Sequence, residues 1–175
     1  MPVKDPRETY DDLITTERCE ELSPEAFTDH ASSEAMAAGW VVVAYVFDDA
    51  GRVLLIDEPW ADGWKSPAGT HQPGESLAET LRREVREETG IEARAGRPHA
   101  AETYTAVNAE TGDTASMVAV GMAASAETTT IATDPGVEGE TIEDVRWFEE
   151  LPRAVFNPDV TEPVYRRCLE THGSR

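Results

Sequence analysis

The stretch Leu77–Thr89, LAETLRREVREET, constrains the fold most, because both of its ends carry helix signals and its acids follow a helical period. Ser76, with Glu79 three residues later, forms a capping box that starts a helix. Gly90 stands where a C-terminal cap glycine belongs. The upstream residues 58–75 are rich in proline and glycine, which predicts a loop that leads into the helix.

The acids of this helix are predicted to lie on its inward side. At about 100° per residue, Leu81 and Val85 define the apolar stripe, and Glu84 and Glu88 fall within or beside it. Glu87 flanks them, so the three carboxylates form one cluster with spacings of three and four residues. A helix with a merely solvated charged face would carry these acids on its outer side, which is instead occupied by Glu79, Arg82 and Arg86.

Three neighbouring carboxylates that are partly buried repel one another, and each needs water, a proton or a counterion. A divalent cation resolves this conflict, because Mg²⁺ and Mn²⁺ prefer oxygen ligands and usually keep water and phosphate in their shell. Arg83 adds one positive charge whose planar fork suits a carboxylate. The helix alone also fits a second interpretation, a salt-bridged edge that holds no metal.

The loop and helix together, GTHQPGESLAETLRREVREETGI, resemble the signature of the Nudix hydrolases, the MutT-like family. That signature requires a glycine, five residues, a glutamate, seven residues, an Arg-Glu pair, an aliphatic residue, one residue, a Glu-Glu pair, one residue, a glycine and an aliphatic residue. All nine fixed places are filled here, by Gly69, Glu75, Arg83, Glu84, Val85, Glu87, Glu88, Gly90 and Ile91. The resemblance favours the metal site over the salt-bridged edge.

The resemblance implies a role for each of these residues. Glu84, Glu87 and Glu88 would be ligands of Mg²⁺ or Mn²⁺, with the backbone carbonyl of Gly69 as a further ligand. Glu75 and Arg83 would orient the cluster, because the arginine pairs with glutamates of the signature and keeps their carboxylates aimed.

Two groups outside the signature are weaker candidates. Some family members use an acid from a late loop as the general base or as an extra ligand, and DPGVEGETIED offers Glu138 as a metal ligand and Glu140 as a catalytic group. The competing interpretation is a flexible acidic loop in an acidic protein. Lys65 lies close to the expected phosphate side, where it would contact substrate, although a surface lysine is the plainer interpretation.

The rest of the chain predicts a mixed α/β domain. Two apolar runs around an Asp/Gly turn predict a hairpin, and later runs predict two more strands, a short strand and a final amphipathic helix. Together with the resemblance, this pattern implies a Nudix α/β/α sandwich with a mixed sheet and a loop–helix–loop catalytic motif. The predicted segments are 40–47, 52–57, 99–107, 114–126, a strand starting at 145, and 163–170.

The chain is divided by composition into an N-terminal extension and a Nudix hydrolase domain. Residues 1–38 are polar and acidic, and SPEAF predicts one short helix within them. Residues 39–175 carry the apolar runs and the signature. The extension would either pack on the core or mediate a homodimer, and the sequence leaves both open.

The charge balance limits the partners. With 35 acidic against 15 basic residues the formal net charge is −20, typical of proteins from microbes that keep concentrated salt in the cytoplasm. The other interpretation, an acidic surface for a basic partner, fits less well because the acids are spread along the chain. No basic patch favours nucleic acid, and no long apolar run favours a membrane. We therefore expect a cytoplasmic protein with two reduced cysteines and a small nucleotide substrate.

The expected activity is metal-dependent hydrolysis of the diphosphate linkage in a nucleoside diphosphate derivative. ADP-ribose and other nucleotide sugars, or (d)NTPs including oxidised ones, are the candidate substrates. One alternative is a Nudix-fold module that binds a ligand without catalysis, although such modules commonly lose glutamates of the signature. The other is isopentenyl diphosphate isomerase, which needs a cysteine in a strand before the signature and further histidine ligands.

Overall fold

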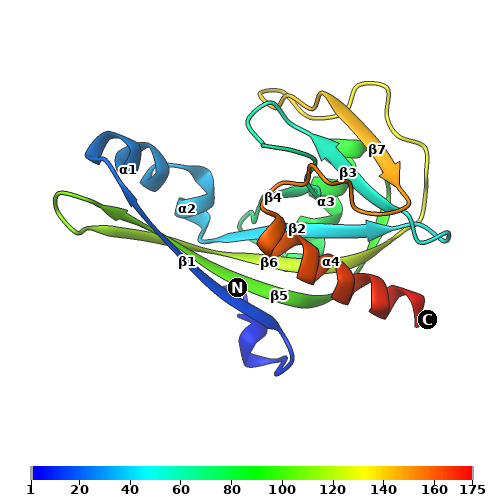
Figure 1. The fold of residues 1–175 in the computed structure, drawn as a ribbon, viewed down its shortest axis with the longest axis horizontal. Coiled ribbons are helices and arrows are strands. Elements are labelled where there is room, and N and C mark those ends of the chain that lie inside the picture. Colours follow the sequence, from blue (N-terminus) through cyan, green and yellow to red (C-terminus); the bar gives the residue numbers. More distant parts are fainter. Residues whose placement is uncertain (1, 175) are drawn as a thin grey trace.

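A seven-stranded mixed sheet forms the centre of the computed structural model, which describes residues 2–174 (Figure 1). Its strand order is β1-β5-β6-β2-β3-β7, and the short β4 pairs with β2 beside β3. The pairs β1·β5 and β2·β6 are parallel and the others are antiparallel. The strands are β1 (Ile14–Leu22), β2 (Trp40–Phe47), β3 (Val53–Asp57), β4 (Ala68–Thr70), β5 (Ala93–Asn108), β6 (Thr114–Ala126) and β7 (Asp144–Phe148).

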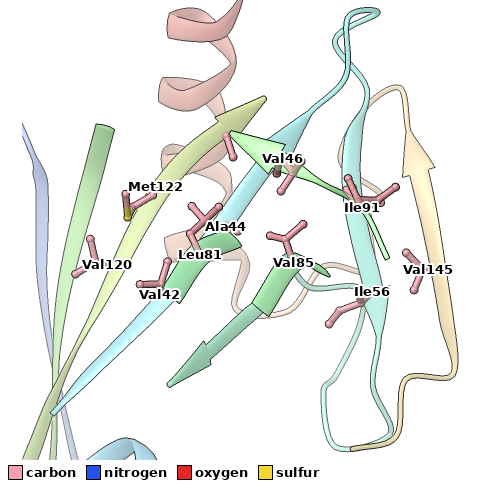
Figure 2. Close-up of a cluster of buried hydrophobic side chains, with 13 residues drawn as sticks. Val42, Ala44, Val46, Ile56, Leu81, Val85, Ile91, Val120, Met122 and Val145 are labelled. Carbon is pink, nitrogen blue, oxygen red and sulfur yellow. The ribbon is translucent and has the colours of Figure 1, made fainter. Parts of the chain in front are cut away.

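Helices cover both faces of this sheet, as the sandwich prediction requires. Along β2, Val42, Ala44 and Val46 face a core that α3 closes with Leu81 and Val85 (Figure 2). The alternate residues of β2 face a second core on the other side, which α4 closes. The helices are α1 (Pro24–Ala31), α2 (Glu34–Ala38), α3 (Leu77–Thr89) and α4 (Pro158–Gly173), and a short 3-10 turn, η1, spans Pro6–Glu8.

Most predicted elements are confirmed, but η1, β1 and α2 were not predicted, and the structure differs at three further places. The predicted loop 58–75 contains β4, the strand predicted at 99–107 starts at Ala93, and the final helix starts at Pro158. The short β4 was missed because three small residues, Ala68 to Thr70, carry no period of their own and pair only through β2. No helix within residues 2–174 combines the length and the apolar character that crossing a bilayer requires.

The N-terminal segment contributes a full strand to the sheet. The helix predicted from SPEAF is confirmed as α1, but β1 was not predicted. Its sequence, ITTERCEEL, is mostly polar, because β1 is an edge strand whose side chains are mostly exposed. Nine residues of β1 pair in parallel with β5, so this segment packs on the core of the molecule.

Candidate functional site

Helix α3 places Glu84 and Glu88 on its inward side as its sequence predicts, but not Glu87, which the same prediction put in their cluster. Both hydrogen bonds of the capping box between Ser76 and Glu79 are present, and Gly90 ends the helix in the left-handed conformation at φ 77°. Glu84 and Glu88 are buried, with 6% and 3% of their surface exposed. The inward face of α3 therefore carries two charged groups directly beside the apolar core.

A third acid joins them from a distant part of the chain. One carboxylate oxygen from each of Glu84, Glu88 and Glu140 lies within 4.8 Å of the other two. Glu87 lies outside this group of three and faces Arg83 at 3.3 Å, with 28% of its side chain exposed. Glu138 is not brought into the group either, so of the two late-loop candidates only Glu140 reaches the acids of α3.

The loop that carries Glu140 is bound to the end of α3 by backbone hydrogen bonds. Ala132 donates its N–H to the carbonyl of Thr89 at 3.0 Å, and Gly136 donates to the carbonyl of Glu87 at 2.8 Å. Beyond the acid, Glu143 donates to the carbonyl of Asp57 in β3 at 2.8 Å. These contacts hold the loop so that the carboxylate of Glu140 lies beside those of Glu84 and Glu88. No local pattern in the sequence predicts this position.

Burial makes these acids weaker than ordinary carboxyl groups. Desolvation raises the pKa of Glu84 to about 7, against the opposing effect of Arg83. Desolvation also raises the pKa of Glu88 to about 9, with further upward contributions from Glu58 and Glu84. Two buried carboxylates and an exposed third, with oxygen atoms within 4.8 Å of one another, are a donor set that a hard divalent cation satisfies.

Arg83 holds the glutamates in place. Its Nε donates to Glu75 Oε1 at 2.6 Å, one terminal nitrogen donates to Glu84 Oε1 at 2.5 Å, and the other to the Thr70 carbonyl at 2.9 Å. The hydrogen bond from Arg83, assisted by one from Thr80, lowers the pKa of Glu75 to about 2. The arginine thus ties the loop, the helix and β4 into one network.

Strand β4 lies directly against the buried carboxylates. A Cβ built on Gly69 would lie 1.9 Å from the carboxyl carbon of Glu84, so any larger residue here would have to displace that carboxylate. The N–H of the preceding residue, Ala68, donates to Glu88 Oε2 at 3.0 Å. The glycine of the signature therefore permits close approach of backbone to the acids, and its carbonyl as a ligand stays a prediction.

Lys65 is buried rather than on the surface. Its Nζ pairs with Glu58 Oε1 at 2.6 Å and lies 5.1 Å from the centre of the Trp60 ring. It is also close enough to Glu88 to oppose the rise in pKa of that acid. The plainer interpretation of a surface lysine is therefore wrong, and a phosphate contact stays a prediction.

A cavity of about 540 Å³ opens on the opposite, α4 side of the sheet. The strand registers place Glu102, Ala119, Val41 and Thr70 in one row across β5, β6, β2 and β4, and all four line the cavity. The neighbouring row contains Ala100 and Gly121. The hollow exists because these central positions carry small residues, while β1, α1, α2 and the start of α4 form its walls.

Strand β4 separates the acidic group from this cavity and borders both. Gly69 lies against Glu84 on one side and lines the cavity on the other, and Lys65 lines the cavity beside it. Of the residues that line the cavity, only Gly69 and Lys65 could be singled out from the sequence. One signal was present, since a glutamate at 102 within a predicted strand is unusual and indicates a specific role.

The two cysteines lie apart from the acidic group. Cys168 belongs to α4 and is fully buried in the core that this helix closes, and Cys19 is exposed on β1. Burial raises the pKa of the Cys168 thiol to about 12. Cys19 does lie in a strand before the signature, but among residues 2–174 no histidine joins the group of possible metal ligands, and the isomerase alternative needs such histidines.

Comparison with known proteins identifies a family whose domain matches most of this chain. The NUDIX domain matches residues 38–166 of this chain. A human protein described as 8-oxo-dGDP phosphatase NUDT18 is 42% identical over 55 residues, and its mouse counterpart is 38% identical over 55 residues. These stretches cover 30% of this chain and 17% of each relative, so the chain spans less than a fifth of the curated relatives it matches.

Solved structures share the fold at low sequence identity. An ADP-ribose pyrophosphatase from Streptococcus suis has a TM-score of 0.55 and 18% identity, over 77% of this chain and 92% of that one. A UDP-X diphosphatase has a TM-score of 0.55 and 20% identity, over 86% and 73%. A MutT protein from Bacillus halodurans has a TM-score of 0.52 and 22% identity, over 74% and 81%. At these identities the likeness establishes the arrangement of strands and helices.

Proposed function

The chain belongs to the NUDIX family, and we propose that it is a Nudix pyrophosphohydrolase that cleaves the diphosphate linkage of a nucleoside diphosphate derivative. The observation that carries this proposal is the group of three carboxylates, Glu84, Glu88 and Glu140, directly against β4 and next to a cavity large enough for a nucleotide.

These three acids are the residues we propose to hold Mg²⁺ or Mn²⁺, with the Gly69 carbonyl as a further ligand. When bound, the cation neutralises charge on the diphosphate and orients the attacking water. The fit rests on the donor set, which offers oxygen atoms only: Glu84 and Glu88 are buried, Glu140 is exposed, and the backbone of Gly69 closely approaches the Glu84 carboxylate.

The remaining residues of the signature have two proposed roles: some orient the metal-binding carboxylates, and one accepts a proton. Arg83 and Glu75 fix the direction of the Glu84 carboxylate through the hydrogen bonds described above. Glu87 is adjacent to the three acids, partly exposed and outside their group, and its ion pair with Arg83 is long at 3.3 Å, so it is the proposed acceptor of a proton from water. Lys65, which lines the cavity beside β4, is the proposed contact for a phosphate oxygen.

The substrate candidates are nucleoside diphosphate derivatives such as nucleotide sugars, or (d)NTPs, including oxidised ones. The named activities of similar proteins span this range: an ADP-ribose pyrophosphatase, a UDP-X diphosphatase and an 8-oxo-dGDP phosphatase. All three act on a nucleotide that carries at least two phosphoryl groups. That shared group is what the acidic site and the neighbouring cavity support.

The test is turnover of a panel of such nucleotides by the purified protein, with Mg²⁺, with Mn²⁺ and with a chelator, and products resolved by chromatography. We expect metal-dependent release of a phosphorylated product from at least one substrate. The Glu87→Gln variant should lose turnover while it keeps metal-dependent thermal stabilisation, and Glu110→Gln, on an exposed turn, should match the wild type. Nucleotide binding without any turnover in the wild type would instead indicate a ligand-binding module.

The assay should be run at high salt. We propose that the net charge of −20 adapts the protein to a salt-rich cytoplasm, because screening by ions relieves the self-repulsion of the folded state. The midpoint of thermal unfolding should then rise steadily between low salt and molar KCl. A midpoint independent of KCl would contradict the adaptation without affecting the proposed reaction.

A further inference from the structure

The far end of the cavity, away from β4, carries charged and planar groups on an otherwise apolar surface. Glu102 on β5 is 8% exposed and lines this end, and Arg18 from β1 lies beside it with Nε 3.8 Å from Glu102 Oε1. The Arg18 guanidinium lies over the ring of Tyr104, 4.4 Å from its centre. Tyr104 in turn donates its hydroxyl to Glu20 Oε2 at 2.9 Å.

These groups stand at a nucleotide's length from the acidic site. Glu102 and Thr70 share one row across four strands, so three interstrand spacings separate them. At about 4.8 Å per spacing this is about 14 Å, comparable to the extent of a nucleoside diphosphate from base to terminal phosphate. A ligand with its diphosphate beside β4 is therefore long enough to reach Glu102 with its base.

The chemistry of Glu102 selects among bases. A carboxylate only accepts hydrogen bonds, and the Arg18 contact at 3.8 Å is longer than a hydrogen bond, so Glu102 has acceptor capacity to offer a ligand. Guanine presents two adjacent N–H donors, at N1 and at the 2-amino group, on one edge. Adenine and cytosine pair one donor with a ring nitrogen acceptor, and uracil and thymine flank one donor with two carbonyls, so each would direct a lone pair at the carboxylate.

A second group in the cavity wall lacks a partner. Ser66 is 4% exposed, lines the cavity, and its Oγ makes no hydrogen bond to any described residue. A buried hydroxyl without a partner costs free energy that a ligand can recover. Its position three residues before Gly69 puts this donor near the ribose or phosphate of a nucleotide that spans the row.

From these observations, and building on the proposed function, we propose that the cavity is a guanine nucleotide subsite in which Glu102 accepts hydrogen bonds from the base and Arg18, stacked on Tyr104, provides a planar surface for it. Arg18 and Glu20 come from the segment before residue 38, where the NUDIX match begins. The N-terminal strand thus completes the recognition site.

The test is binding of GMP, IMP and AMP to the full-length protein by calorimetry at high salt with Mg²⁺. IMP differs from GMP only by the missing 2-amino group. We expect GMP to bind about tenfold more tightly than IMP, and more tightly than AMP, because one hydrogen bond to a buried carboxylate is lost. In Glu102→Gln the ratio of GMP to IMP affinity should fall towards one, because the amide accepts at one atom only.

Glu17→Gln, an exposed acid on the same strand as Arg18, is the matched control and should keep the wild-type ratio. Thermal unfolding of each variant verifies its folding, and Ala119→Leu, which fills the cavity, should weaken all three ligands together. Equal binding of GMP and IMP, no binding of either, or an unchanged ratio in Glu102→Gln would overturn the subsite. Turnover plays no part in this test, so a guanine preference without hydrolysis would remove the proposed function and leave the subsite standing.

Discussion

The two sides of β4 are built in different ways. On the α3 side, the residues that orient the acids come from one continuous segment, 69–91, joined by a single distant acid, Glu140. On the α4 side, the cavity is assembled from strands β1, β2, β4, β5 and β6 and three helices, with no more than a few residues from each.

This difference separates chemistry from recognition. The acidic side needs fixed distances between a few charged groups, and one capped helix supplies them through spacings of three and four residues. The cavity needs a shape, which depends on small residues at Ala100, Ala119 and Gly121 on the paired strands β5 and β6. Changes on the two sides should therefore have separable effects: loss of turnover on one, loss of affinity on the other.

The largest effect is expected from Glu84→Gln. This change removes one charge from the buried group and the partner of Arg83, so turnover should fall by about 10³-fold or more. Steady-state rates at saturating substrate and Mg²⁺ measure this, and GMP affinity should stay within a few-fold of the wild type. A comparable loss of GMP affinity would mean that the two sides are not separable.

Glu75→Gln should have an intermediate effect on the acidic side. Glu75 orients Arg83 from outside the group of three acids. Loss of a residue that orients metal ligands without binding the metal typically lowers metal affinity or activity 10- to 100-fold, and we expect turnover to fall by that factor.

The lowered pKa of Glu75 also stabilises the fold above pH 4.5, and that contribution is lost as pH falls towards 2. Denaturant unfolding should therefore separate the variant from the wild type at pH 7 and bring them together near pH 2.5. A constant difference at both pH values would contradict the ion pair.

Ala119→Leu probes the cavity side alone. The larger side chain occupies the centre of the row between Glu102 and Val41. Because it takes up space that the substrate needs, KM should rise by about tenfold or more. The increase in unfolding temperature that Mg²⁺ produces should be unchanged. An equal loss of the metal effect would show that the substitution disturbs β4 rather than the cavity.

The smallest effect concerns the pH dependence of metal-induced stability. The pKa values of Glu84 and Glu88 are raised to about 7 and about 9, so the metal-free fold binds protons more tightly than the unfolded chain and loses stability between about pH 5 and pH 9. Mg²⁺ competes with those protons, so its stabilisation should grow over the same range. Scanning calorimetry should give a gain of about 3–8 °C at pH 8.5 and almost none at pH 5.5. A gain that is constant with pH, or as large in Glu84→Gln, would place the metal elsewhere.

The same contrast decides what the sequence can predict. The helical period and the capping box predicted α3 and the inward direction of Glu84 and Glu88 correctly, because those properties are local. Glu140 could be proposed only as one of several loop acids, since its place depends on backbone hydrogen bonds to Thr89 and Glu87.

The cavity and β1 could not be predicted from local pattern. Strand β1 is polar along its length because it lies at the edge of the sheet, so its sequence has no clear alternation of buried and exposed residues. The row from Glu102 to Thr70 depends on strand order, and residues 102, 119, 41 and 70 meet only after β5, β6, β2 and β4 are assembled. Pairing between distant strands is the information that a single sequence lacks.

The central claim is that a single substrate spans both sides of β4. A crystal structure of Glu87→Gln with Mn²⁺ and a guanosine diphosphate tests this directly, because anomalous scattering locates the metal and density locates the base. The account predicts Mn²⁺ among Glu84, Glu88 and Glu140, the diphosphate beside β4 and the base in the cavity against Glu102. A nucleotide bound outside the cavity, or Mn²⁺ away from these three acids, would contradict it.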